Sequence, residues 1–346
     1  MINAIKEEDM ASPIQEILFG SPGTGKSWRI DNDIIPNRLN IDIKNKPQNV
    51  IKAVFHPEYT YGDFIGKLLP ITRINSVQYN YYEGHFLRAL AQSYKNLIDA
   101  KSDNKDPENA VLVIDEINRG NSSSIFGSIF QLLDRDDDGW SSYSINISDM
   151  ELIKILTLSG IEVPYDKNGE IDIEKLRKTQ TKYEYLRFDF INKKIKMPPN
   201  LSILATMNTS DSSIYYMDSA FKRRWDWTFI TPESKTIEKE GVAFNNQEEW
   251  IKFISKLNNF IKANHKHIRG IEDKQIGQYF IKESLIKKSS IQNKLMFFIW
   301  DSVFSRDKSP LVKLLNGNQP SHDLITFGDF AKDVDNFISK INNFKI

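Results

Sequence analysis

A glycine-rich loop near the start of the chain has the residue types and spacing to hold a phosphate chain. It runs from Gly20 to Ser27 and fits the pattern G-x-x-x-x-G-K-[ST], in which backbone N–H groups cradle the phosphates of a nucleotide. Lys26 would reach the β- and γ-phosphates, and Ser27 would hold Mg²⁺. The other loop residues are Ser21, Pro22, Gly23, Thr24 and Gly25. A strand pattern before the loop and a helix after it favour this interpretation over a chance glycine turn.

Two acids end the clearest strand pattern of the chain, AVLVIDE at 110–116. Asp115 can anchor Mg²⁺ through water, and Glu116 can polarise an attacking water as a general base. Ligands of parallel sheets bind beyond the carboxyl ends of the strands, so both acids are expected to face the phosphate loop. A strand that ends in two solvated acids is the alternative interpretation, and the presence of the loop favours the functional one.

Two further motifs carry groups suited to phosphate chemistry. LSILATMN places Asn208 at the end of another strand, where its amide could hydrogen-bond the γ-phosphate and the attacking water; an Asn that closes a turn is the alternative. AFKRRW places Arg223 and Arg224 at the end of a helix. An arginine that reaches a neighbour's γ-phosphate stabilises transition-state charge, whereas the helix dipole alone also favours a basic C-terminus.

The apolar patterns predict the elements that must position these groups. Strands are expected at 14–19, 50–55, 110–116, 201–208 and 225–230, and helices at 84–100 and 122–134. Strands alternating with helices predict an α/β fold with a mostly parallel sheet. Residues 56–83 and 135–200 interrupt the alternation. The stretch at 135–200 is interpreted as an inserted subdomain, because it is far longer than an ordinary connection.

The last part of the chain has a different pattern. Helical spacing recurs at 248–265, 284–304 and 327–344. It predicts a small all-helical lid domain over 246–346, after a boundary near 232–246. Residues 1–13 form a polar lead-in, and the nucleotide-binding domain is expected to span 14–235.

Composition excludes several classes of protein. The chain has 346 residues, 40% of them hydrophobic, and no apolar run approaches the ~20 residues that span a bilayer. Its 46 basic and 46 acidic residues cancel, which gives no support to direct DNA binding. Cysteine is absent, which excludes disulfides and cysteine metal sites. The N-terminus is too polar for a signal peptide, so a cytoplasmic location without a membrane partner is expected.

Six blocks of sequence together resemble the McrB family, the AAA+ GTPase subunits of McrBC-type restriction systems. In the family's order they are GSPGTGKS, VFHPEYTYGDFIG, VLVIDEINRGNSSSIFG, MPPNLSILATMNTSD, MDSAFKRRW and IGQYF. The resemblance covers nearly the whole chain from residue 14. It implies a P-loop sheet and a helical lid that assemble into a nucleotide-bound ring, usually a hexamer. It also implies a McrC-like partner subunit that stimulates hydrolysis and carries the nuclease.

The resemblance also assigns residues by position. Asn208 becomes the residue that positions the catalytic water, and Asp211 closes the MNTSD signature, which is associated with GTP use. The family often continues this signature with arginine, where this chain has Ser212, and nucleotide choice between GTP and ATP therefore stays open. Arg223 and Arg224 become candidate fingers that act on a neighbouring subunit, and the motif does not choose between them.

Two other features bear on partners. Asn118 and Arg119, in DEINRGN, are expected close to the site or between subunits. Family members often carry an N-terminal DNA-reading domain, and with the phosphate loop starting at Gly20 no room is expected for one. Target recognition is therefore assigned to another subunit or to the insert at 135–200, and DNA is expected to be met indirectly.

Two other functions remain possible alongside the favoured one. A MoxR-type ATP-driven chaperone or remodelling protein would share the phosphate loop, the two acids and the arginines. A structural ring subunit would bind nucleotide for assembly and turn it over slowly. The favoured interpretation is a nucleoside triphosphatase, with GTP preferred to ATP, that drives a restriction system in antiviral defence and is not itself the nuclease. The tyrosines expected to pack in the core or between subunits, rather than on bases, are Tyr59, Tyr61, Tyr79, Tyr81 and Tyr82.

Overall fold

A parallel β-sheet forms the centre of the first of two units into which the chain divides, residues 1–225 and 226–346. The computed structural model describes residues 13–73, 76–208, 215, 217–231, 240–281, 283, 285–316, 324 and 326–345. In the first unit the strands lie in the order β2-β5-β8-β1, with the bounds Val50–Val54, Ala110–Asp115, Leu201–Asn208 and Gln15–Gly20. Neighbouring strands are all parallel. The predicted α/β class with a parallel sheet is confirmed.

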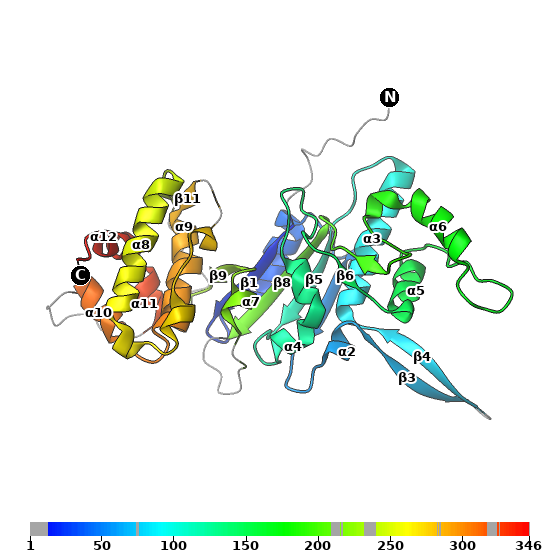
Figure 1. Ribbon diagram of the computed structural model, residues 1–346, viewed down its shortest axis with the longest axis horizontal. Helices are drawn as coiled ribbons and strands as arrows, with labels where there is room; N and C mark the ends of the chain where they lie inside the picture. Colours follow the sequence, from blue (N-terminus) through cyan, green and yellow to red (C-terminus); the bar gives the residue numbers. More distant parts are fainter. Residues whose placement is uncertain are drawn as a thin grey trace. The chain divides into compact units, whose positions relative to one another are not determined.

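The strand sequences explain why these segments are central. β5 and β8 are buried along almost their whole length, and a parallel sheet covered on both faces needs such continuous apolar runs. The long helix α3, His85–Asp103, packs against β2 and β5 (Figure 1). It buries Phe86, Leu90 and Tyr94, which recur at helical spacing along one face.

The other helical segments of this part of the fold are short. They are α1 (Lys26–Arg29), η1 (Ile30–Arg38), η2 (Pro47–Asn49), α2 (Tyr61–Phe64), α4 (Ser122–Phe126), η3 (Gly127–Leu133) and α7 (Ser219–Lys222). The single helix predicted at 122–134 is wrong in one respect, because it changes at Gly127 from an α-helix to a 3₁₀-helix. Gly127 has a φ of 49°, and a Cβ there would lie 3.0 Å from the ring of Tyr61. The close approach and the positive φ both favour glycine.

A β-hairpin that the sequence patterns do not predict projects from the first unit (Figure 1). Its strands, β3 (Gly66–Arg73) and β4 (Ser76–Glu83), pair antiparallel along their full lengths. Of the tyrosines expected to pack, Tyr59 is in the core, but Tyr79 and Tyr82 are 64% and 44% exposed. Neither strand buries a whole face. β4 does carry a short alternation of apolar and polar residues, VQYNY at 77–81, which was the available signal for a strand.

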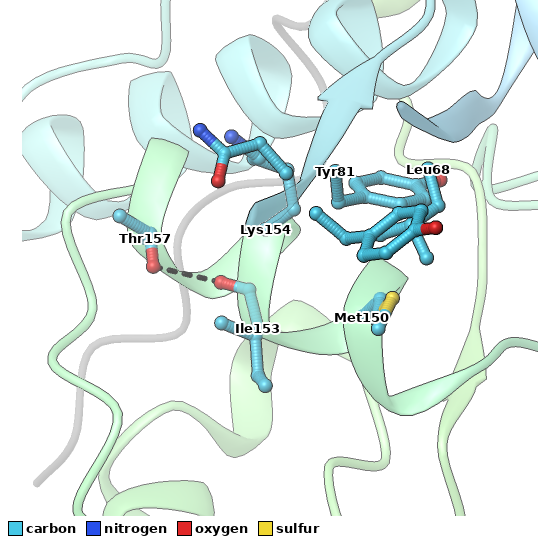
Figure 2. A pocket seen from close by; sticks show the side chains of 8 residues that line it. Leu68, Tyr81, Met150, Ile153, Lys154 and Thr157 are labelled. Atoms are coloured by element: carbon cyan, nitrogen blue, oxygen red, sulfur yellow. Dashed lines mark hydrogen bonds between the residues drawn. The ribbon is translucent and has the colours of Figure 1, made fainter. Parts of the chain in front are cut away.

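The hairpin meets the insert at α5, Asp149–Leu158. Figure 2 shows Leu68 and Tyr81 of the hairpin beside Met150 and Ile153 of α5, around a pocket of about 340 Å³. Burial raises the pKa of Tyr81 well above its usual value. The apolar contact with α5 therefore fixes the base of the hairpin, while its far end stays in water.

The second unit is mainly helical. Its helical segments are α8 (Gln247–Ala263), η5 (His265–His267), η6 (Ile271–Lys274), η7 (Gln278–Phe280), α9 (Lys288–Ser290), η8 (Ile291–Met296), η9 (Ile299–Val303), α10 (Ser309–Asn316), α11 (Phe327–Ala331) and α12 (Val334–Asn342). β9 (Asp226–Phe229) opens the unit, and β10 (Val242–Phe244) pairs antiparallel with β11 (Ile286–Lys287), so the predicted lid also contains a small ladder. In the described part of the chain, no helix combines the length and apolarity needed to cross a membrane.

The insert at 135–200 begins after η3 and ends before β8, and its two ends meet at one side chain, that of Arg135. The elements of the insert are β6 (Ile145–Asn146), α5, α6 (Ile173–Lys182), η4 (Glu184–Leu186) and β7 (Lys194–Ile195). Arg135 Nη1 donates to the carbonyls of Gly139, Met197 and Pro198, at 2.8, 3.1 and 2.9 Å. Its Nη2 donates to the carbonyl of Leu201 at 2.8 Å. Burial lowers the pKa of Arg135 to about 9, so the guanidinium stays charged at neutral pH and joins both ends of the insert.

We expect Arg135→Met to lower the stability of the first unit by about 2–4 kcal/mol, because it removes one donor from each of four carbonyls, of which those of Met197 and Pro198 keep a backbone donor. For a unit of this size that corresponds to roughly 5–10 °C in the thermal unfolding midpoint. Arg187→Met is the matched control, because Arg187 pairs with Asp138 in the same insert but is 45% exposed. The control should change stability by less than about 1 kcal/mol. Equal shifts for the two variants would show that Arg135 does not hold the insert.

Candidate nucleotide-binding site

The phosphate loop lies between β1 and α1, as its pattern predicts. Gly20 ends β1 and Gly25 caps α1. Gly23 and Gly25 have φ angles of 76° and 83°, in the left-handed region where a side chain would be strained. Thr24 Oγ1 donates to the carbonyl of Ser21 at 3.0 Å and braces the turn. The backbone shape of the loop thus requires the glycines that the motif specifies.

Lys26 is only 7% exposed, although it carries a charge. Its Nζ donates to the carbonyls of Gly20 (3.1 Å) and Ser21 (2.8 Å), and to Oδ1 of Asn208 (2.8 Å). A buried ammonium is tolerated when its donors are satisfied. These three acceptors are uncharged, and a phosphate oxygen binds an ammonium more strongly because that hydrogen bond is charge-assisted. The surroundings of Lys26 therefore suit an incoming phosphate.

Asn208 joins Lys26 to Glu116. While its Oδ1 accepts from Lys26, its Nδ2 donates to Glu116 Oε1 at 2.5 Å. The register of β1 and β8 sets Asn208 opposite Gly20, so strand pairing fixes where this amide lies. Three residues predicted from separate motifs thus form one continuous hydrogen-bonded set.

Glu116 has a strained backbone. Its φ is 57°, in the left-handed region that costs an ordinary residue roughly 1–2 kcal/mol. Strain of this kind persists where the surroundings determine the conformation, and it is commonest at functional sites. Glu116 Oε2 is buried without a hydrogen bond and lies 3.5 Å from Nε of Arg119. One carboxylate oxygen is therefore bound by Asn208, and the other faces a cation.

Thr206 is a site residue that sequence reasoning missed. Its Oγ1 donates to Asp115 Oδ1 at 3.0 Å and accepts from the backbone N–H of Glu116 at 3.1 Å. One hydroxyl therefore positions both acids. The available signal was a polar residue two positions before Asn208 in a mostly apolar strand; the structure leaves Thr206 only 2% exposed.

Ser27 and Asp115 lie together at the carboxyl edge of the sheet. Ser27 Oγ donates to Asp115 Oδ1 at 3.1 Å. A hydroxyl and a carboxylate are oxygen ligands of the kind that Mg²⁺ takes, and Mg²⁺ commonly binds through one or two carboxylates together with substrate phosphates. The two side chains fit a Mg²⁺ ion that would neutralise phosphate charge when bound.

Asn118 supports the end of β8. It is 3% exposed, and its Nδ2 donates to the carbonyl of Asn208 at 2.8 Å. The carbonyl of Asn118 accepts from the backbone N–H of Tyr215, also at 2.8 Å. Asn118 thus fixes the main chain on which the Asn208 amide depends. Asp211 and Ser212, singled out in the sequence, lie outside the described residues.

The two candidate finger arginines have different surroundings. Arg224 is 10% exposed, and its Nε and Nη2 both donate to Asp134 Oδ2, at 3.0 and 2.7 Å. Its guanidinium carbon also lies 3.9 Å from the ring centroid of Phe130. Arg223, at the C-terminal end of α7, is exposed. Arg224 is therefore committed to contacts within its own unit, and Arg223 is available to another molecule.

Comparison with known proteins agrees with this geometry. The family model of the AAA domain, dynein-related subfamily, matches residues 16–138, which include the phosphate loop, Asp115 and Glu116. The YdiS component of the type II restriction enzyme BsuMI of Bacillus subtilis (strain 168) is 28% identical over 331 residues, 88% of this chain and 83% of the relative.

A second relative is the EcoKMcrB subunit of the type IV methyl-directed restriction enzyme of Escherichia coli (strain K12). It is 26% identical over 238 residues, which are 67% of this chain but only 39% of that subunit. The chain therefore matches well under half of the length of this relative. The resemblance predicted from the motifs is confirmed: residues 16–138 match an AAA domain, and the chain is similar to components of restriction enzymes, one of them an McrB subunit.

Proposed function

We propose that this chain hydrolyses GTP in preference to ATP and is the ring-forming motor of a restriction system whose DNA is cut by a separate nuclease subunit. The observation that supports hydrolysis most is the hydrogen-bonded set that runs from Lys26 through Asn208 to Glu116. It combines a cation for the phosphates, an amide that can orient water and a carboxylate that can accept a proton.

The proposed reaction is in-line transfer of the γ-phosphoryl group to water. Lys26 binds the phosphate oxygens in place of its neutral acceptors. The Asn208 amide orients the water, and Glu116 takes its proton as the water oxygen bonds to phosphorus. The bond to the β,γ-bridging oxygen breaks, and the nucleoside diphosphate and inorganic phosphate leave.

The proposals that the nucleotide is GTP and that partner subunits exist do not rest on the geometry of the site. The MNTSD signature supports GTP, and the names of both relatives, a component and a subunit of restriction enzymes, support a system of several proteins. The proposed assembly is a homo-oligomeric ring, a hexamer by resemblance, in the cytoplasm with a McrC-like nuclease. An exposed Arg223 fits a ring, because such a side chain can reach the site of a neighbour.

Steady-state hydrolysis of GTP and ATP, measured side by side, tests the nucleotide assignment. We expect faster turnover with GTP and a fall of at least about 100-fold in Glu116→Gln, because glutamine cannot take the proton. Glutamine keeps an oxygen that can accept from Asn208, so this variant should still bind GTP. Lys26→Ala should lose binding. A preference for ATP would instead favour a MoxR-type remodelling protein, and normal turnover by Glu116→Gln would exclude Glu116 as the base.

Mixing of inactive variants tests whether Arg223 acts on a neighbouring subunit. Arg223→Ala and Glu116→Gln should each hydrolyse GTP slowly, because the first lacks the finger and the second lacks the base. Mixed before assembly, they should regain activity, since a Glu116→Gln subunit can supply Arg223 to an intact site next to it. In the control, Arg223→Ala is mixed with the double variant Glu116→Gln/Arg223→Ala instead of with Glu116→Gln. This mixture should not regain activity, because neither subunit carries Arg223. Failure of the first mixture to recover would contradict action between subunits.

Arg224→Ala should differ from Arg223→Ala in stability. Removal of Arg224 leaves Asp134 without its partner, and we expect a loss of about 1–2 kcal/mol in the free energy of unfolding. Arg223→Ala, at an exposed position, should stay within about 0.5 kcal/mol of the parent. Denaturant unfolding of both variants checks this, and a destabilised Arg223→Ala would place Arg223 in the fold.

A further inference from the structure

Trp28, directly after Ser27 of the phosphate loop, has a side chain that is 68% exposed. The tryptophans that are at most 7% exposed are Trp140, Trp225, Trp227 and Trp250. Tryptophan is enriched at surfaces that contact another molecule, because its ring has apolar faces and its N–H can hydrogen-bond. None of the roles proposed above uses this side chain.

The helix that follows the loop explains the exposure of Trp28. Lys26 and Ile30, four positions apart, are both buried and lie on one face. Trp28 lies midway between them and therefore on the opposite face. Its carbonyl accepts from Nδ2 of Asn32 at 2.8 Å. A fixed main chain thus presents the indole ring at the end of the phosphate loop.

We propose that Trp28 stacks on the base of the nucleotide held by the phosphate loop. The inference rests on the nucleotide binding proposed for that loop. The loop holds the phosphates as far as Ser27, the base is tethered to them through a single ribose, and the Cα of Trp28 is only about 3.8 Å further along the chain. Stacking tolerates any base, because every base has a π-face. Trp28 therefore strengthens binding of GTP and ATP alike and does not select between them.

The charges around Trp28 favour a base over a neighbouring protein. Arg29 Nε lies 3.6 Å from Asp33, and Asp31 lies 2.7 Å from Lys52 Nζ. These side chains of the same helical segment are thus engaged within the chain. The surface offers an aromatic face among paired charges, which suits the flat, uncharged ring of a base.

Acrylamide quenching of tryptophan fluorescence tests the proposal in the full chain. GDP and inorganic pyrophosphate both carry two phosphates for the loop, but only GDP carries a base. If Trp28 stacks on the base, GDP should protect from acrylamide the tryptophan fluorescence that is quenched most easily, and pyrophosphate should not. The Trp28→Phe variant should lack this easily quenched fluorescence, because Trp28 is its source. Equal protection by the two ligands would show a change in the loop alone and would overturn the proposal.

Affinity measurements give the second test. Trp28→Ala should bind GDP and ADP each about tenfold more weakly, while Trp28→Phe retains most of the affinity. The affinity for pyrophosphate and the thermal midpoint should not change, because the ring is exposed. Tyr79→Ala, which removes a ring that is 64% exposed from β4, is the matched control and should bind GDP normally.

The outcomes separate this proposal from the function on which it rests. Unchanged GDP affinity in Trp28→Ala would refute stacking and leave the proposed function standing. Protection that arises only at concentrations where the chain assembles would assign Trp28 to a contact between subunits, and would also refute stacking. If the unaltered chain bound neither GDP nor pyrophosphate, both the stacking and the proposed function would be wrong.

Discussion

The buried ammonium of Lys26 is the constraint on which the rest of the site depends. A charge removed from water needs strong acceptors, and here two of them follow from the end of β1 and a third from the end of β8. These oxygens can meet only if the two strands are neighbours, parallel and in the register that sets Gly20 opposite Asn208. The sheet order of the first unit is therefore also the condition for binding phosphate.

Glu116 is held by Asn208, which also contacts Lys26. The backbone of Glu116 is strained, with a φ of 57°. Asn208 serves both residues at once, with its oxygen toward the lysine and its nitrogen toward the carboxylate. A phosphate that replaces the acceptors of Lys26 frees the amide oxygen of Asn208. In the part of the chain that the structure describes, Asn208 is the one side chain hydrogen-bonded to both Lys26 and Glu116. In the proposed mechanism, a single amide would therefore couple phosphate binding to the position of Glu116, the proposed general base.

The sequence predicted the site where the chemistry requires a residue type at a strand end, as for Asp115. It did not single out Thr206, because threonine is also an ordinary strand residue and its partner Asp115 lies 91 positions away. Nor could it separate Arg223 from Arg224, since the distinction depends on Asp134, 90 positions distant. The β3–β4 hairpin was missed although β4 alternates apolar and polar residues over 77–81, because the alternation is short and β3, GKLLPITR, does not share it.

Residues one or two positions apart, in a short helix or at its end, can face the interior of the fold and the solvent respectively. Side chains one and two positions apart in a helix point about 100° and 200° apart, so a buried residue can be followed closely by one that faces outward. Lys26 is buried and Trp28 is exposed, and the order is reversed at Arg223 and Arg224. In each case the inward residue is tied by hydrogen bonds of the fold. The exposed residues, Trp28 and Arg223, are one or two positions from these hydrogen-bonded residues along the main chain. A short helical segment can therefore build the site and also present a group to a ligand or a neighbouring subunit.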